Sequence, residues 1–136
     1  MKLLSMGVLA GALLGAPAKH FSTIQTVIHN TATLKVHGEY KVVDQTTGTV
    51  LDDEQYVVVQ NQTYTTNAVT FTGDPVITLT WITGPNFVNM GFVALAPDGT
   101  SLPCQSLSGF NGSLGPIDAG PHGAGQWTMT FKSSCP

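Results

Sequence analysis

The chain has 136 residues, enough for one domain with a hydrophobic core. Hydrophobic residues make up 42% of it, which argues against disorder, whereas charged residues reach only 10%, against a typical ~25%. The net charge is -3, and the five basic residues are lysines that form no basic run, so the composition argues against a nucleic-acid partner.

The N-terminal segment has the features of an export signal. A lysine follows the first methionine, residues 3–15 are apolar and small, and the Ala-Pro-Ala sequence at 16–18 matches the small-x-small cleavage pattern. The apolar run is short for a membrane span, which needs ~20 residues. We therefore predict a signal peptide over residues 1–18 and one mature domain over residues 19–136, secreted or held at the cell surface. If the segment is retained, it is expected to be an apolar helix that needs a covering partner.

The first half of the mature chain alternates apolar and polar side chains over short runs, as half-buried strands do. Strands are predicted over residues 21–28, 33–43, 55–66 and 68–72. In the second run Gly38 lies on the apolar face, and we interpret it as a β-bulge. Asp44–Gly48 and Asp52-Asp53-Glu54 are predicted turns, because Asp and Gly favour turns.

The second half predicts three further strands, over residues 76–81, 87–95 and 126–132. The run 87–95 is apolar on both faces, which is typical of a central strand covered on both sides. Pro97-Asp98-Gly99 is a predicted turn, and residues 104–125 are predicted to be irregular because they are rich in Gly, Ser and Pro. Trp81 and Trp127 alternate in step with apolar neighbours and are expected in the core.

These seven or eight strands, with no helical period after the N-terminal segment, predict an all-β fold. We expect an antiparallel β-sandwich, most simply a jelly roll. Cys104 and Cys135 are predicted to form one disulfide in an oxidising compartment, contributing about 3–4 kcal/mol.

Three features of the second half occur together over residues 69–132: Trp81 at a strand end, the Ala-Leu-Ala-Pro-Asp-Gly-Thr run at 94–100, and the Gly-x-Trp-Thr strand within 123–131. With these features, this part of the chain resembles the P domain of proprotein convertases and the pre-peptidase C-terminal domains of secreted proteases. The resemblance implies a non-catalytic jelly-roll module. Those families carry acidic residues, sometimes linked to calcium, where this chain has Asn89-Met90-Gly91, so the resemblance implies the fold and not the calcium.

The sequence carries no recognisable catalytic arrangement. Its carboxylates lie at turn signals, where they more often cap the backbone, except Glu39, which shares a polar strand face with His37. The stretch at 111–115 lacks the first glycine of a nucleophile elbow, and no helix is predicted after it. We therefore predict that the protein is not an enzyme and uses no cofactor, and a hydrolase is the least favoured function.

A calcium site is one alternative for the acidic residues of the first half. The candidates are Asp44, Asp52, Asp53 and Glu54, and calcium takes about six to eight oxygen ligands. The spacing is unlike that of an EF-hand, so a solvated hairpin tip is favoured and no metal is predicted.

Tyr64 is the aromatic side chain that we expect to be exposed for stacking on a sugar. Asn61, Gln62 and Thr66 lie near it in sequence and could bond sugar hydroxyls. Asn61 and Asn111 are also candidate N-glycosylation sites, if the source glycosylates exported proteins.

Three functions follow as expectations. The first is a secreted, non-catalytic β-sandwich module that binds an extracellular glycan or protein. The second is a structural subunit of an extracellular filament or surface layer, assembled by strand pairing or by packing of the apolar segment. The third is a lipid-binding sandwich of the aegerolysin type.

Overall fold

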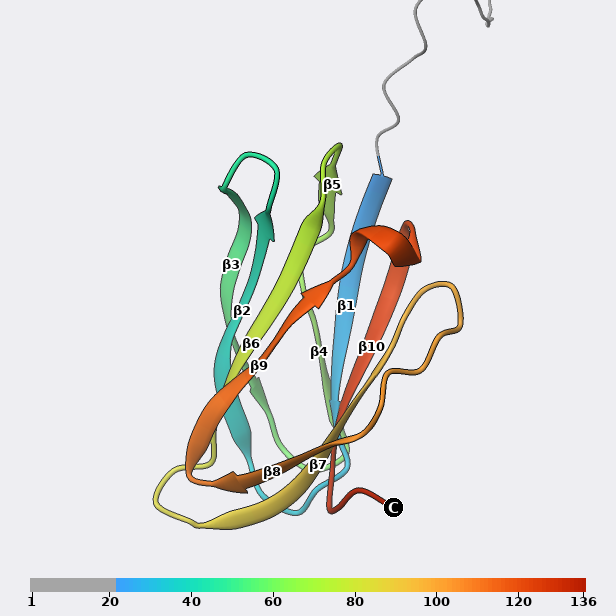
Figure 1. The fold of residues 1–136 in the computed structure, drawn as a ribbon. Helices are drawn as coiled ribbons and strands as arrows, with labels where there is room; N and C mark the ends of the chain where they lie inside the picture. The colour runs from blue at the N-terminus through green and yellow to red at the C-terminus, as the bar shows by residue number, and fades with distance from the viewer. Residues whose placement is uncertain (1–21) are drawn as a thin grey trace, which may run out of the picture.

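The computed structural model describes residues 22–136, which form two β-sheets packed face to face (Figure 1). The larger sheet contains β1 (Ser22–Asn30), β4 (Gln62–Thr65), β5 (Val69–Phe71), β7 (Val88–Leu95), β8 (Gln105–Gly109) and β10 (Gly125–Lys132). The smaller sheet contains β2 (Val36–Asp44), β3 (Thr49–Val58), β6 (Pro75–Ile82) and β9 (Asn111–Asp118). The predicted β-sandwich is therefore confirmed.

The strand orders are β4-β1-β10-β7-β8, with β5 also paired to β1, and β3-β2-β6-β9. All pairs are antiparallel except β1 with β10, which is parallel. This pair departs from the fully antiparallel sheets that we expected, and it joins the first and last described strands. Within residues 22–136 no helix is long and apolar enough to cross a membrane.

The core lies between the sheets and follows the predicted alternation. Trp127, Met129 and Phe131 of β10 are completely buried, as are Ile24 and Ile28 of the adjacent β1. Each such side chain stabilises the fold by about 1.5–3 kcal/mol relative to exposure. The predictions that both tryptophans are buried and that the last strand presents this apolar face are confirmed, since Trp81 is 3% exposed.

The acidic run Asp52-Asp53-Glu54 was predicted as a turn, and that prediction is wrong. These residues lie within β3, paired with β2. Asp52 and Glu54 fall on the same side of the strand as the buried Tyr56, whereas Asp53 is exposed on the opposite side. A carboxylate can occupy an inward position here because β3 is an edge strand, where neighbouring polar groups reach it.

Residues 104–125 were predicted to be irregular and instead contain β8, β9 and the short 3-10 turn Gly120–His122. Strand β9 pairs with β6 and places the buried Leu114 in the core. Gly109 and Gly115 have φ of 113° and 102°, conformations that suit glycine at the ends and irregularities of strands. The glycines that suggested a loop therefore lie in or next to two strands, β8 and β9.

Gly38 does not mark a bulge, because the pairing of β2 with β3 runs unbroken past it. The register shifts instead between Val42 and Val43. A side chain at Gly38 would collide with the backbone carbonyl of Thr80 on β6. The same carbonyl accepts a hydrogen bond of 2.6 Å from the Tyr56 hydroxyl, so glycine is needed for the close approach of β6.

The predicted strand 55–66 is two strands that belong to different sheets. The chain leaves β3 and enters β4 through Asn61, which has φ of 64°. The Asn61 amide donates to the Asn30 carbonyl at 2.6 Å, which fixes the crossing against the end of β1. Asn tolerates this left-handed conformation better than most residues, so it suits the corner.

The Cys104–Cys135 disulfide is confirmed, with a Cα–Cα distance of 5.7 Å. It fixes the C-terminal tail against β7, where a side chain at Gly91 would come within 2.7 Å of the Ser134 backbone. The tail thus covers part of the outer face of β7, but Asn89 and Leu95 on that face remain exposed. The expectation of a strand covered on both sides holds only near Gly91.

Candidate functional site

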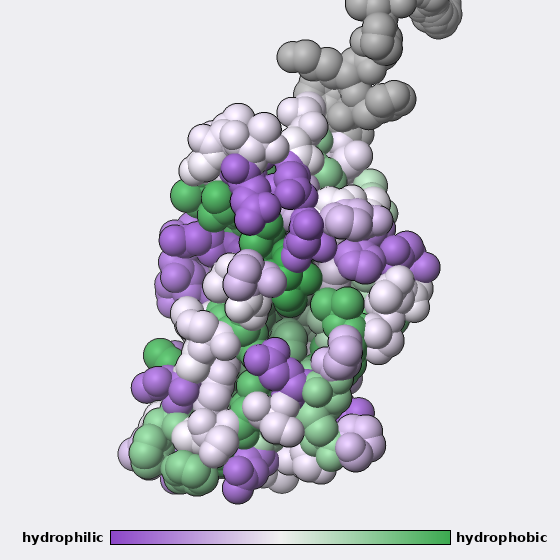
Figure 2. All heavy atoms as spheres, in the orientation of Figure 1, coloured by the Kyte–Doolittle hydropathy of each residue, from purple (hydrophilic) through white to green (hydrophobic). Residues whose placement is uncertain are grey.

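One end of the sandwich exposes large apolar side chains. We call it the aromatic end and define it by Ile82, Phe87 and Phe110, which are 37%, 62% and 46% exposed. They lie at the end of β6 and on the β6–β7 and β8–β9 connections, at the opposite end from the start of β1 (Figure 1). Figure 2 shows apolar atoms gathered at this lower end of the molecule. Exposed apolar groups that cluster in this way mark interaction sites more often than scattered ones do.

Buried Thr83 holds the two phenylalanine-bearing connections together. Its amide donates to the Phe110 carbonyl at 2.9 Å, and its hydroxyl lies 3.0 Å from the Asn86 carbonyl and 3.2 Å from that of Phe110. The Phe87 and Phe110 rings meet edge to face, with centroids 5.7 Å apart and planes at 88°. The two rings are therefore fixed in place, so a partner that contacts them does not have to order them first.

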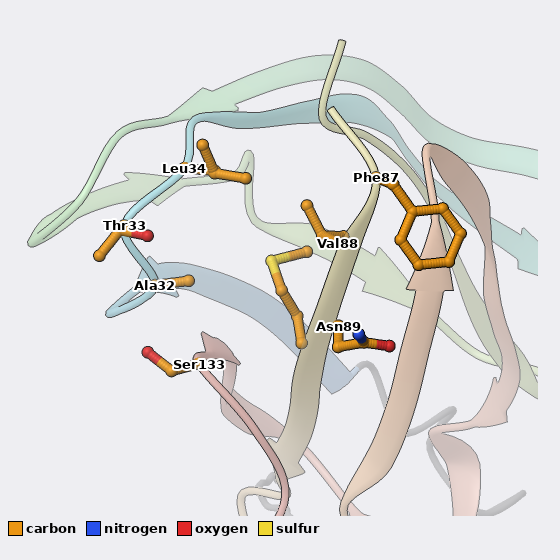
Figure 3. Close-up of a pocket in the computed structure, with 8 residues that line it drawn as sticks. Ala32, Thr33, Leu34, Phe87, Val88, Asn89 and Ser133 are labelled. Atoms are coloured by element: carbon orange, nitrogen blue, oxygen red, sulfur yellow. The ribbon is translucent and has the colours of Figure 1, made fainter. Parts of the chain in front are cut away.

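A small hollow of about 170 Å³ lies beside Phe87 (Figure 3). It opens between the β1–β2 connection and the start of β7, where the sheets leave the lower part of the core incompletely covered. Its lining is Ala32, Thr33, Leu34, Phe87, Val88, Asn89, Met90 and Ser133. In Figure 3 the Phe87 ring points away from the hollow, so the ring forms a projecting rim and not a wall.

A second hollow, of about 230 Å³, opens at the side of the sandwich between β7 and β9. Figure 2 shows apolar atoms in a recess on this face. Its apolar lining includes Phe92 and Ala94, which are only 3% and 2% exposed. The rest of its lining includes the exposed Pro103 and Pro116 and the half-buried Leu102 and Ile117, but no exposed aromatic side chain like those of the aromatic end.

The richest polar arrangement lies elsewhere, at the open edge between β3 and β4. We call Asp52, Glu54, Tyr64 and Asn67 the carboxyl cluster. The Tyr64 hydroxyl donates to Glu54 Oε1 at 2.6 Å, and the Asn67 amide donates to Glu54 Oε2 at 3.0 Å. The Asn67 side-chain amide also lies 3.4 Å from Asp52 Oδ1. These bonds join an edge strand of one sheet to the edge of the other.

The two carboxyl groups of the cluster differ in proton affinity. Burial raises the pKa of Asp52 to about 6, and the hydrogen bond that its protonated form gives to Glu54 adds to this. Burial also acts to raise the pKa of Glu54, but the hydrogen bonds from Asp52, Tyr64 and Asn67 outweigh it and lower the pKa. Asp52 Oδ2 is enclosed and meets no donor among the described residues, so it is best accommodated when it carries the proton itself.

A pair of carboxyls whose pKa values are separated can serve as acid and base in catalysis. In this cluster both oxygens of Glu54 already accept bonds from the protein, and Tyr64 is held by the same contact. That bond, followed by burial, raises the pKa of Tyr64 to about 12. The polar groups of the cluster hydrogen-bond to one another, so the cluster joins the edges of the two sheets.

The predicted sugar-binding residues do not form one surface. Tyr64 is half-buried and packs towards the core, 6.5 Å from the Tyr56 ring, and its ring does not stand out as the expected stacking platform. Thr66 is 2% exposed, and its hydroxyl accepts a hydrogen bond from the Thr26 amide at 3.0 Å. Asn61 and Gln62 are exposed at the corner between β3 and β4.

The predicted calcium candidates are separated by the fold. Asp44 is 7% exposed and caps the β2–β3 turn, where it accepts from the Thr46 amide at 2.9 Å. Asp53 points to the opposite face from Asp52 and Glu54, towards Glu39, whose pKa is raised mainly by a hydrogen bond with Asp53. Within residues 22–136 no three His, Cys, Asp or Glu side chains are placed to hold a metal ion.

The end of the sandwich where β1 begins is acidic. Asp44, Asp74 and Asp118 lie there at the ends of β2, β6 and β9, and hydrogen bonding with Asp118 raises the pKa of Asp74. Asp98, in the turn after β7, contacts His122 Nδ1 at 2.9 Å. The amide of Thr100, followed by His122, lowers the pKa of Asp98 to about 2.

The sequence did not identify the aromatic end. Phe87 was assigned to a fully covered strand, but it lies just before β7, and Phe110 was placed in an irregular stretch. A usable signal existed in both cases, because each phenylalanine adjoins glycine-containing turn sequence, where side chains tend to be exposed. The candidate glycosylation residues Asn61 and Asn111 are both exposed, and Asn111 adjoins Phe110.

Comparison of the chain with known protein families, with curated proteins and with solved structures gives no match. The resemblance to the P domain therefore stays a prediction.

Proposed function

We propose that this protein is a secreted, non-catalytic β-sandwich module that binds an extracellular partner through its aromatic end. The observation that carries the proposal is the fixed, edge-to-face pair of Phe87 and Phe110, exposed by 62% and 46%. Leaving such side chains in water forgoes the stabilisation that burial would give. A partner that covers the rings recovers it.

The disulfide and the N-terminal sequence support the extracellular part of the proposal. The Cys104–Cys135 bond persists in an oxidising compartment, and residues 1–18, which lie outside the described residues, carry the pattern of a signal peptide. The non-catalytic part is supported by the carboxyl cluster, whose Glu54 is engaged by Tyr64 and Asn67.

Binding of the mature protein to a panel of glycans, extracellular proteins and lipid vesicles tests the proposal. The variant is Phe87→Ser with Phe110→Ser. The matched control is Val50→Ser with Leu95→Ser, because these residues are 52% and 44% exposed and lie away from the aromatic end. We expect at least one class of partner to be retained by the control and lost by the variant. Equal binding by the variant and the control across the whole panel would contradict the proposal.

A further inference from the structure

The charged side chains of the described residues are distributed unevenly between the two ends. Lys35 lies on the β1–β2 connection, next to the lining of the hollow beside Phe87, and Lys132 ends β10 opposite Gly91, the fourth residue of β7. Both lysines therefore lie in the half of the sandwich that carries Phe87 and Phe110. The strand register places Asp44, Asp74, Asp98 and Asp118 at the opposite end. The carboxylate side chain of residues 22–136 that comes nearest to the aromatic end along β2 is Glu39, two residues beyond His37, the partner of Ile82. The aromatic end therefore combines exposed apolar rings with positive charge.

From this placement we propose that the aromatic end docks on the surface of an anionic lipid bilayer, with Phe87 and Phe110 inserted among the headgroups. The inference rests on the proposed function and names its partner. Apolar side chains that enter the interface contribute buried area, and lysines close to the surface are attracted by anionic lipids. Both contributions come from the same end of the sandwich.

The fold keeps the aspartates of the acidic end away from such a surface, and Glu39 is the carboxylate that comes nearest to it along β2. A strand of eight residues such as β7 spans about 26 Å, whereas electrostatic interactions are screened over about 8 Å at physiological salt. The acidic end thus lies well beyond the screening length when the aromatic end touches the bilayer. A chain that carries more carboxylates than lysines can approach an anionic surface in this one orientation.

The shape of the aromatic end suits a lipid surface better than a sugar. The Phe87 and Phe110 planes meet at 88°, so the rings form a projecting wedge and not the coplanar platform on which successive sugar rings stack. The hollow beside Phe87 is lined mainly by side chains that are themselves nearly buried, such as Val88 and Met90 at 5% exposure each. It offers little depth for an anchoring side chain of a protein partner.

Co-sedimentation with phosphatidylcholine vesicles, with and without phosphatidylserine, tests the inference on mature protein from a host that does not glycosylate. We expect binding that phosphatidylserine strengthens and salt weakens. Phe87→Ser with Phe110→Ser should weaken it by ~10-fold or more, whereas the Val50→Ser with Leu95→Ser control should bind like the unmodified protein. Lys35→Gln and Lys132→Gln should each weaken binding to the anionic vesicles by ~5-fold.

Three results would overturn the inference. Failure to bind vesicles, while a glycan or a protein is bound through Phe87 and Phe110, removes the lipid partner and leaves the proposed function standing. Concentration-dependent self-association that Phe87→Ser with Phe110→Ser abolishes, in the absence of vesicle binding, would show that a second copy covers this end. If the Phe87→Ser with Phe110→Ser variant binds every partner as well as the unmodified protein does, both the inference and the proposed function are contradicted.

Discussion

The carboxyl cluster and the aromatic end differ in what their side chains contact. In the cluster, Glu54 accepts bonds from Tyr64 and Asn67, and the polar groups satisfy one another. At the aromatic end, Phe87 and Phe110 are held firmly but remain uncovered. The carboxyl cluster, with its shifted pKa values, therefore serves the fold, whereas we propose that the chemically plain aromatic end offers the surface for a partner. Networks that serve only the structure also shift pKa values, so a shifted pKa does not by itself identify a functional site.

The largest effect on stability is expected from removing the disulfide. This change tests the comparison because it should lower stability without changing binding at the aromatic end. Cys104→Ser with Cys135→Ser should destabilise the protein by about 3–4 kcal/mol, because the bond closes a segment of 31 residues. Binding at temperatures where the variant is folded should persist, since Thr83 and not the tail holds Phe87 and Phe110. Urea denaturation of both proteins measures the difference, and a change below about 1 kcal/mol would contradict it.

The second largest effect on stability is expected from the loss of the Glu54 side chain. Glu54→Ala should destabilise the fold by about 1–2 kcal/mol, because the Tyr64 hydroxyl and the Asn67 amide lose their acceptor at a partly buried site. Gln55→Ala is the control, since Gln55 is the exposed neighbour on the other face of β3. Chemical denaturation that finds the two variants equally stable would mean that the cluster does not join the sheets.

Asp52 should make the stability of the protein depend on pH. Its pKa is raised from 3.8 to about 6 in the folded state, so the folded state binds this proton more tightly than the unfolded state does. The resulting stabilisation of the fold is complete below about pH 4 and is lost as the pH rises through about 6. Asp52→Asn should remove this loss, so the Tm of the variant should exceed that of the unmodified protein at neutral pH. The prediction fails if the Tm difference between the two proteins is constant from about pH 4 to neutral.

The smallest effect is expected at Asp98, and it should have the opposite sign. The pKa of this carboxyl is lowered to about 2, so its stabilising effect is present above its ordinary value of 3.8 and is lost as the pH falls through about 2. Asp98→Asn should lower Tm slightly at about pH 5, and the difference should shrink in strong acid. A Tm difference that grows with acidification would contradict the assignment. Scanning calorimetry at a series of pH values measures both carboxyls together.

The sequence predicted the parts of the fold in which alternation is strong. The strands around Trp81 and Trp127 and the Cys104–Cys135 bond could be predicted because each depends on residues close in sequence or on a single pair of cysteines. The pairing of β1 with β10, and the crossing from one sheet to the other at Asn61, depend on contacts between distant segments. No local pattern encodes them.

The candidate site was harder to predict, for two physical reasons. Asp52-Asp53-Glu54 suggested a turn because an inward carboxylate is costly unless partners reach it, and those partners, Tyr64 and Asn67, come from another sheet edge. Phe87 is exposed because β7 begins at the next residue, and a strand boundary is set by pairing with β8. An apolar side chain in a sequence does not by itself reveal which side of that boundary it occupies.

The most direct test of the account compares two variants in the same pair of assays. Glu54→Ala should lower Tm but bind as the unmodified protein does when both are folded, because the carboxyl cluster lies away from the aromatic end. Phe87→Ser with Phe110→Ser should keep Tm within about 2 °C of the unmodified value, because exposed substitutions change stability little, and should lose binding. Loss of binding in folded Glu54→Ala, together with full binding by the phenylalanine variant, would contradict the division of roles between the two regions.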